Sequence, residues 1–138
     1  MKTVFVDTGY WIAIVNPNDD LHQISRRITH QLIPFKIVTS ELVFNELLNT
    51  FSKQGTLLKQ AAISLVKKSY HNSNIEIVPQ TTELFRTALE LYEQRPDQSW
   101  SHTDCSSFQI MRQNNILEAL AYDKHFEQAG FIPLLRLK

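Results

Sequence analysis

The 138-residue sequence carries 14 basic and 14 acidic side chains, and this balance argues against a protein that binds nucleic acid by nonspecific electrostatic attraction. A hydrophobic fraction of 43% and a charged fraction of 20% predict one folded domain over residues 1–138 rather than a disordered chain. Cys105 is the single cysteine, so no internal disulfide can form, and we expect a protein of the reducing cytoplasm.

The first half of the chain alternates strand-like and helix-like segments. An apolar run at 3–6 predicts a buried strand, and its place so close to the start predicts no signal peptide. A helix opened by Thr8 should end before Pro17, and Asp19 or Asp20 can cap a second helix. The next expected elements are a strand at 35–39, a helix from Glu41 to about Lys53 capped by Ser40, a helix at 56–70 and a strand at 75–78.

The second half continues this alternation. We expect, in order, a helix from Thr82 to about Gln94, a polar loop at 97–102, a helix from Thr103 to about Asn115, a strand at 116–122, a helical turn at 124–129 and a last strand at 132–137. Strands that alternate with helices predict an α/β fold, with a parallel sheet of four or five strands and helices on both faces. The longest apolar run, Tyr10–Val15, is too short to span a bilayer, so we expect no membrane partner.

Two carboxylates, Asp7 and Asp123, directly follow strand-like apolar runs. In open parallel sheets, ligands bind beyond the carboxyl ends of the strands, where the strand order reverses. The two acids would face one crevice if their strands are neighbours. For Asp7 the alternative is that it only caps the following helix, a common role for aspartate.

Glu46 lies inside the apolar stripe of its expected helix, at i+4 from Leu42 and i+3 from Val43. Carboxylates are rarely buried without a partner, so this position indicates either a functional group or a side chain at the edge of the stripe that reaches water.

Asp104 has two interpretations that the sequence leaves open. It follows Ser101 by three residues, the spacing of a capping box, and an acid in the first turn suits the helix dipole. It is also followed at i+4 and i+7 by Phe108 and Met111, which places it on an apolar face.

Together the four acids favour a metal site. Two carboxylates ~5 Å apart repel by roughly 3 kcal/mol at an effective dielectric constant of about 20. A divalent cation removes this repulsion, and a set of oxygen ligands selects Mg²⁺ or Mn²⁺ over zinc. Such ions suit phosphoryl transfer, because they activate water and stabilise charge on phosphate oxygens.

Four segments resemble the successive signatures of the PIN-domain ribonucleases, and most closely those of VapC-type toxins: VFVDTGYW, TSELVFNELLNTF, DQSWSHTDCSSFQIM and ILEALAYDKHFEQAGF. They cover nearly the whole chain in the family's order. The resemblance implies that Asp7, Glu46, Asp104 and Asp123 are catalytic, metal-binding acids, with the Thr8 hydroxyl beside the first. It also implies strand order 3-2-1-4-5, Mg²⁺ or Mn²⁺, endonucleolytic RNA cleavage, an antitoxin partner and a homodimer.

Residues near the proposed site have weaker signals. We expect His102 and His125 to lie near it and contact RNA, and Asp97 to lie on the loop surface. Cys105 follows His102 at a ligand spacing, but no second His or Cys pair completes a site, which disfavours zinc. Four basic side chains can bind phosphates, although most should be solvated helix residues: Arg86, Arg95, Arg112 and Lys124.

Other functions fit the sequence less well. A haloacid-dehalogenase-type phosphatase needs a second Asp two residues after the first, where this chain has Gly9, and a receiver domain needs a further acidic pair. The remaining alternatives are a housekeeping RNase and a catalytically weak RNA- or protein-binding member of the same fold. Tyr10 and Trp11 fit a core or dimer contact better than a base-stacking surface.

Overall fold

Five parallel strands form the centre of the structure, a computed structural model in which residues 1–136 are described. Their order is β3-β2-β1-β4-β5, as the family resemblance implied. The strands are β1 Lys2–Val6, β2 Phe35–Ser40, β3 Ile75–Val78, β4 Glu118–Leu120 and β5 Ile132–Pro133.

Strand β1 occupies the middle of the sheet. Val4 pairs with Ile37 of β2, and Val6 pairs with Leu120 of β4. The side chains of residues 4–6 are fully buried, although neighbouring residues of a strand point to opposite faces. Both faces of β1 are therefore covered, which explains its unbroken apolar sequence.

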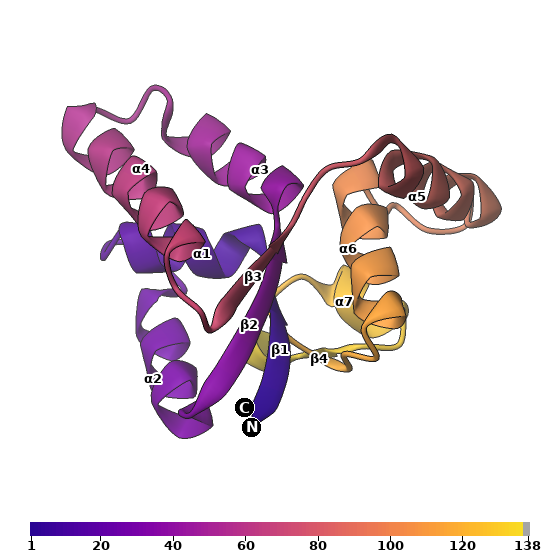
Figure 1. The fold of residues 1–138 in the computed structure, drawn as a ribbon, viewed down its shortest axis with the longest axis horizontal. Coiled ribbons are helices and arrows are strands. Elements are labelled where there is room, and N and C mark those ends of the chain that lie inside the picture. The colour runs from indigo at the N-terminus through magenta and orange to yellow at the C-terminus, as the bar shows by residue number, and fades with distance from the viewer. Residues whose placement is uncertain (137–138) are drawn as a thin grey trace.

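The helices form two groups, one on each side of the sheet (Figure 1). Helices α1 Thr8–Val15, α2 His22–Leu32, α3 Glu41–Phe51 and α4 Thr56–Tyr70 lie on one side, and α5 Thr82–Gln94, α6 His102–Gln113 and α7 Lys124–Gln128 lie on the other. This arrangement confirms the predicted α/β fold with helices on both faces. Within residues 1–136, no helix is both long enough and apolar enough to cross a membrane.

The two strands nearest the C-terminus are shorter than the sequence predicts. The amide of Ile116 still donates a 2.9 Å hydrogen bond to Met111 O at the end of α6, so β4 begins only at Glu118. The predicted strand at 132–137 ends at Pro133, and Leu134–Arg136 form a short 3₁₀ helix, η1, that buries two leucines in the core. Leu137 lies outside the described residues.

Two helix ends also differ from the prediction. Leu21, rather than Asp19 or Asp20, is the N-cap of α2, while the Asp19 carboxylate accepts a 3.0 Å hydrogen bond from the Leu21 amide in the preceding turn. Helix α3 ends at Phe51, about two residues early, where the Ser52 amide turns back to Asn49 O at 3.3 Å.

Candidate active site

Asp7 stands where β1 ends and α1 begins, at the boundary between the two halves of the sheet. Its amide donates a 3.2 Å hydrogen bond to Leu120 O of β4, which fixes the acid between the two central strands. Asp7 is the N-cap residue of α1, but its carboxylate makes no capping hydrogen bond to that helix. The side chain is therefore not used as a cap.

The environment of Asp7 shows that the other acids are close to it. The pKa of Asp7 is raised to about 7, mainly by burial and further by the negative charges of Asp104, Glu46 and Asp123, while the Thr8 amide lowers it. The carboxylates of Glu46, Asp104 and Asp123, which come from three other segments, thus lie close enough to Asp7 to affect its charge.

Glu46 reaches this region from the second turn of α3. Ser40 begins that helix by accepting a 3.1 Å hydrogen bond from the Val43 amide, directly after β2. The Glu46 side chain is half-buried, and its Oε1 accepts a 2.7 Å hydrogen bond from the Thr8 hydroxyl. Its position in the apolar stripe is thus explained by a specific partner beside Asp7.

Asp104 has both roles that the sequence left open. Its amide donates to Ser101 Oγ at 3.0 Å, and its Oδ2 accepts from the Ser101 amide at 3.1 Å, which is a complete capping box at the start of α6. The same Oδ2 lies 3.0 Å from Nδ1 of His125. The cap therefore fixes the carboxylate and leaves it near the other three acids. Asp7, Glu46, Asp104 and Asp123 are called the acid group below.

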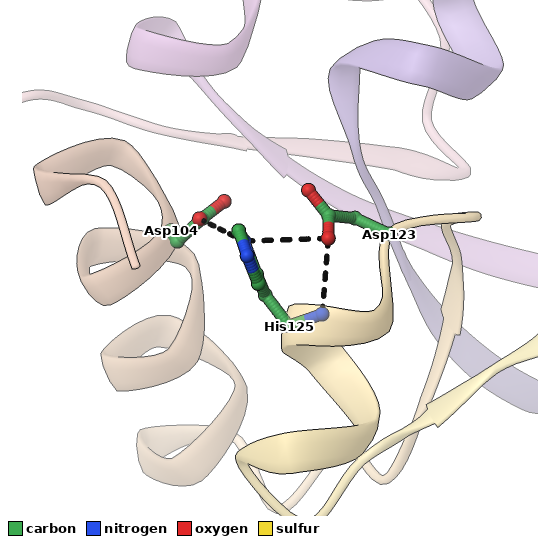
Figure 2. A group of neighbouring side chains, drawn as sticks. All are labelled: Asp104, Asp123 and His125. Carbon is green, nitrogen blue, oxygen red and sulfur yellow. Dashed lines mark hydrogen bonds and ion pairs between the residues drawn. The ribbon is translucent and has the colours of Figure 1, made fainter. Parts of the chain in front are cut away.

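Asp123 lies in the turn between β4 and α7, and His125 is the second residue of α7. Asp123 Oδ1 caps α7 by accepting a 3.0 Å hydrogen bond from the His125 amide, and it lies 3.3 Å from Nδ1 of the same histidine. Figure 2 shows the His125 imidazole between the carboxylates of Asp104 and Asp123. His125 thus holds two acids from different segments in one arrangement.

The donor chemistry of this group fits a cation. Asp104, Asp123 and His125 each offer one ligand atom, and these atoms all lie within 4.8 Å of one another. His125 and Ser101 bind Asp104 Oδ2, and His125 binds Asp123 Oδ1. The second oxygen of each carboxylate accepts no hydrogen bond from residues 1–136. Free oxygens on half-buried carboxylates are the ligands that hard divalent ions prefer.

The sequence matches the PIN domain family over residues 4–132. The chain belongs to the PIN-domain family. It is 30% identical over 132 residues to the 23S rRNA-specific endonuclease VapC20 of Mycobacterium tuberculosis, in two strains, and the match covers 94% of this chain and 95% of that protein. The crystal structure of M. tuberculosis VapC20, described as a sarcin-ricin loop cleaving toxin, aligns with a TM-score of 0.83 and 26% identity, over 94% of this chain and 97% of that one.

Three other residues that the sequence singled out in this PIN-domain protein have the following surroundings. His102 bonds through Nε2 to Phe85 O at 3.0 Å and packs on the Phe85 ring, so it joins α6 to α5. Asp97 pairs with the Arg95 guanidinium at 3.0 Å on the exposed loop, as expected of a surface acid. Cys105 is fully buried.

Tyr10 and Trp11 belong to the core of the PIN fold. Both side chains are 5% exposed, and their polar atoms bond to Thr29 and Thr39 respectively. Among the basic residues, Arg86, Arg112 and Lys124 are exposed, and Arg95 is engaged by Asp97 and Trp100.

The sequence placed His125 near the site but did not predict its contacts with Asp104 and Asp123. Its spacing of two residues after a strand-ending acid was visible, but its contact with Asp104 depends on how α6 and α7 pack.

Proposed function

We propose that this PIN-domain protein is a metal-dependent endoribonuclease whose catalytic acids are Asp7, Glu46, Asp104 and Asp123. The observation that carries the proposal is the cluster of Asp104, Asp123 and His125. Asp7 shares a pocket wall with Asp123, and Glu46 is hydrogen-bonded to Thr8, the neighbour of Asp7. The likeness to VapC20, a 23S rRNA-specific endonuclease, supports RNA as the substrate class.

The acids would hold Mg²⁺ or Mn²⁺. Asp7, Asp104 and Asp123 offer free carboxylate oxygens at the ends of β1 and β4 and the start of α6, and Glu46 completes the set from α3. A bound cation of this kind activates water and neutralises charge that develops on phosphate oxygens.

The remaining residues of the site orient these acids. The Thr8 hydroxyl fixes Glu46, the Ser101 amide fixes Asp104, and His125 fixes both Asp104 and Asp123. Such preorganisation matters because removing the groups that hold metal-binding carboxylates typically lowers metal affinity or activity by about 10- to 100-fold.

The proposal includes a biological role. VapC20 is described as a toxin, and we infer that this chain, as one domain over residues 1–138, is likewise the toxin of a toxin–antitoxin pair. On this proposal it acts in the cytoplasm as a homodimer, and its own antitoxin protein holds it inactive.

Cleavage of RNA by the purified protein tests the proposal. Single-stranded RNA, structured RNA loops and intact 23S rRNA should be cut internally in Mg²⁺ or Mn²⁺ and left intact in EDTA, and Asp7→Asn should be inactive. Asp97→Asn is the matched control, because Asp97 pairs with Arg95 outside the acid group. Cleavage that persists in chelator, or no cleavage with either metal, would contradict the proposal.

A further inference from the structure

A pocket of about 470 Å³ opens directly beside the acid group. Asp7 and Asp123 form part of its wall, and Tyr122, Lys124 and Arg136 supply an aromatic ring and two positive charges. Its volume is in the range of pockets that hold one small ligand. A phosphate that reached Asp7 and Asp123 through a bound cation would leave the adjoining nucleotide in this pocket.

Tyr122 presents a largely exposed aromatic ring at this pocket. Its side chain is 47% exposed, whereas Tyr10, which serves the core, is 5% exposed. It immediately precedes Asp123, so the turn that positions the acid also positions the ring. An exposed, fixed aromatic ring is the surface on which single-stranded nucleic acid stacks its bases.

Arg136 holds Tyr122 in place. Its Nη1 donates a 3.1 Å hydrogen bond to Tyr122 O, and the guanidinium carbon lies 4.9 Å from the centre of the tyrosine ring. A guanidinium group has five N–H donors, and this contact uses one of them. The others can bind phosphate oxygens while the group remains against the ring.

Lys124 adds a second positive charge to the wall of the pocket. It is the first residue of α7, its side chain is exposed, and it forms no ion pair within residues 1–136. The pocket wall thus combines two carboxylates with two cations and an aromatic ring, which matches the phosphate and base of a nucleotide better than an apolar or purely anionic ligand.

We propose that Tyr122, Arg136 and Lys124 form the subsite for the nucleotide next to the phosphate that is cut. Tyr122 stacks against the base, and Arg136 and Lys124 bind the flanking phosphate. This inference rests on the proposed endoribonuclease function and specifies how the same site selects an unpaired nucleotide.

Binding of two labelled RNAs tests the subsite without requiring cleavage. The probes are an eight-nucleotide oligoadenylate and an abasic chain of the same length, measured by fluorescence anisotropy in the Asp7→Asn background. Tyr122→Ala should weaken binding of oligoadenylate by roughly tenfold and leave the abasic chain unchanged, because stacking on an aromatic side chain is lost only where a base is present. Tyr122→Phe should bind both probes like the parent.

The phosphate contacts have a separate signature. Lys124→Gln should weaken both RNAs equally and lower the slope of log affinity against log salt by roughly 0.7, the value for one phosphate contact on a single strand. Tyr92→Ala is the matched control, because Tyr92 is a similarly exposed tyrosine on α5 outside this pocket. It should leave both affinities unchanged.

Two results would overturn the subsite: equal weakening of both RNAs by Tyr122→Ala, or no change in either. Melting curves and the Tyr122→Phe variant separate loss of stacking from loss of folding. The proposed function fails independently, if the wild-type protein cuts no RNA with Mg²⁺ or Mn²⁺ while the base-dependent affinity remains.

Discussion

The Thr8 hydroxyl donates a 2.7 Å hydrogen bond to Glu46 Oε1, and so joins the first residue of α1 to the second turn of α3. Thr8 is 9% exposed, so the bond is shielded from competing water. It ties Glu46 to the segment that carries Asp7, and it turns a carboxylate within an apolar stripe toward the other acids.

Replacing this hydroxyl should separate orientation from folding. We expect Thr8→Val to lower kcat by roughly tenfold, the equivalent of one lost hydrogen bond to a charged group, and to reduce the free energy of unfolding by about 1 kcal/mol. Thr8→Ser keeps the donor and should retain most of the activity. Steady-state cleavage rates and melting curves of the three proteins measure both effects. Equal activity of the valine and serine variants would show that the bond does not orient Glu46.

Asp104→Asn tests whether this acid serves only its capping box. Asparagine can still accept the Ser101 hydrogen bond, so the cap survives while one negative charge is removed. In EDTA the variant should melt at the same temperature as wild type or higher, because repulsion within the acid group is reduced. Added Mg²⁺ should stabilise wild type by mass action and the variant much less.

Asp97→Asn provides the comparison for Asp104, since it removes an acid that lies on the exposed loop. This control should gain as much from Mg²⁺ as wild type. An Asp104→Asn protein that is less stable in EDTA, yet gains as much from Mg²⁺ as wild type does, would contradict the metal cluster.

The pKa of Asp7 predicts an unusual dependence of stability on pH. Burial and the neighbouring charges raise this pKa from 3.8 to about 7, so between these values the folded protein binds a proton that the unfolded chain has lost. The contribution of Asp7 to the free energy of unfolding is therefore fully present below pH 3.8 and is lost as the pH rises to about 7. In EDTA, Asp7→Asn should gain stability relative to wild type across this interval.

Metal should remove that difference, because a cation favours the ionised carboxylate. Melting temperatures of wild type and Asp7→Asn at pH 5 and pH 8, with and without Mg²⁺, provide the measurement. A constant difference between the two proteins at both pH values in EDTA would show that Asp7 has an ordinary pKa.

His125→Ala should weaken the site without removing any acid. Because His125 holds Asp104 and Asp123 together, its loss should raise the Mg²⁺ concentration needed for half-maximal cleavage by tenfold or more. His102→Ala is the matched control, since His102 bonds to Phe85 O instead. Identical metal dependence of the two variants would argue against a positioning role for His125.

Expression in a bacterial host tests the proposed toxin role. The wild-type chain without an antitoxin should slow growth, and Asp7→Asn should not. Equal toxicity of both forms would reject toxicity caused by RNA cleavage, and harmless wild-type protein that still cuts RNA in vitro would favour a housekeeping RNase.

Two acids of the site, Asp7 and Asp123, could be predicted from sequence, because they interrupt apolar runs that are recognisable without any tertiary information. Glu46 was recognisable for a related reason, as a charge where the helical period demands an apolar side chain. Strand order depends on pairing between distant segments, so it came from the family resemblance and not from local patterns.

Contacts between helices set the limit of such prediction. The Ser101–Asp104 spacing correctly predicted a capping box, yet it gave no indication that Asp104 Oδ2 also meets His125. Pro133 is apolar and fits a strand pattern, but it lacks the amide that a longer ladder needs, and the chain turns into η1 instead.

The hydrogen bond from the Asp7 amide to Leu120 O joins a strand at the start of the chain to one close to its end. A chain still being synthesised therefore carries Asp7, Thr8 and Glu46 while Asp123 and His125 are missing. If the protein is a ribonuclease, its active site stays incomplete on the ribosome until residues 118–125 have been added. The topology would thus delay activity until the segment that carries Asp123 and His125 has emerged and β4 has paired with β1.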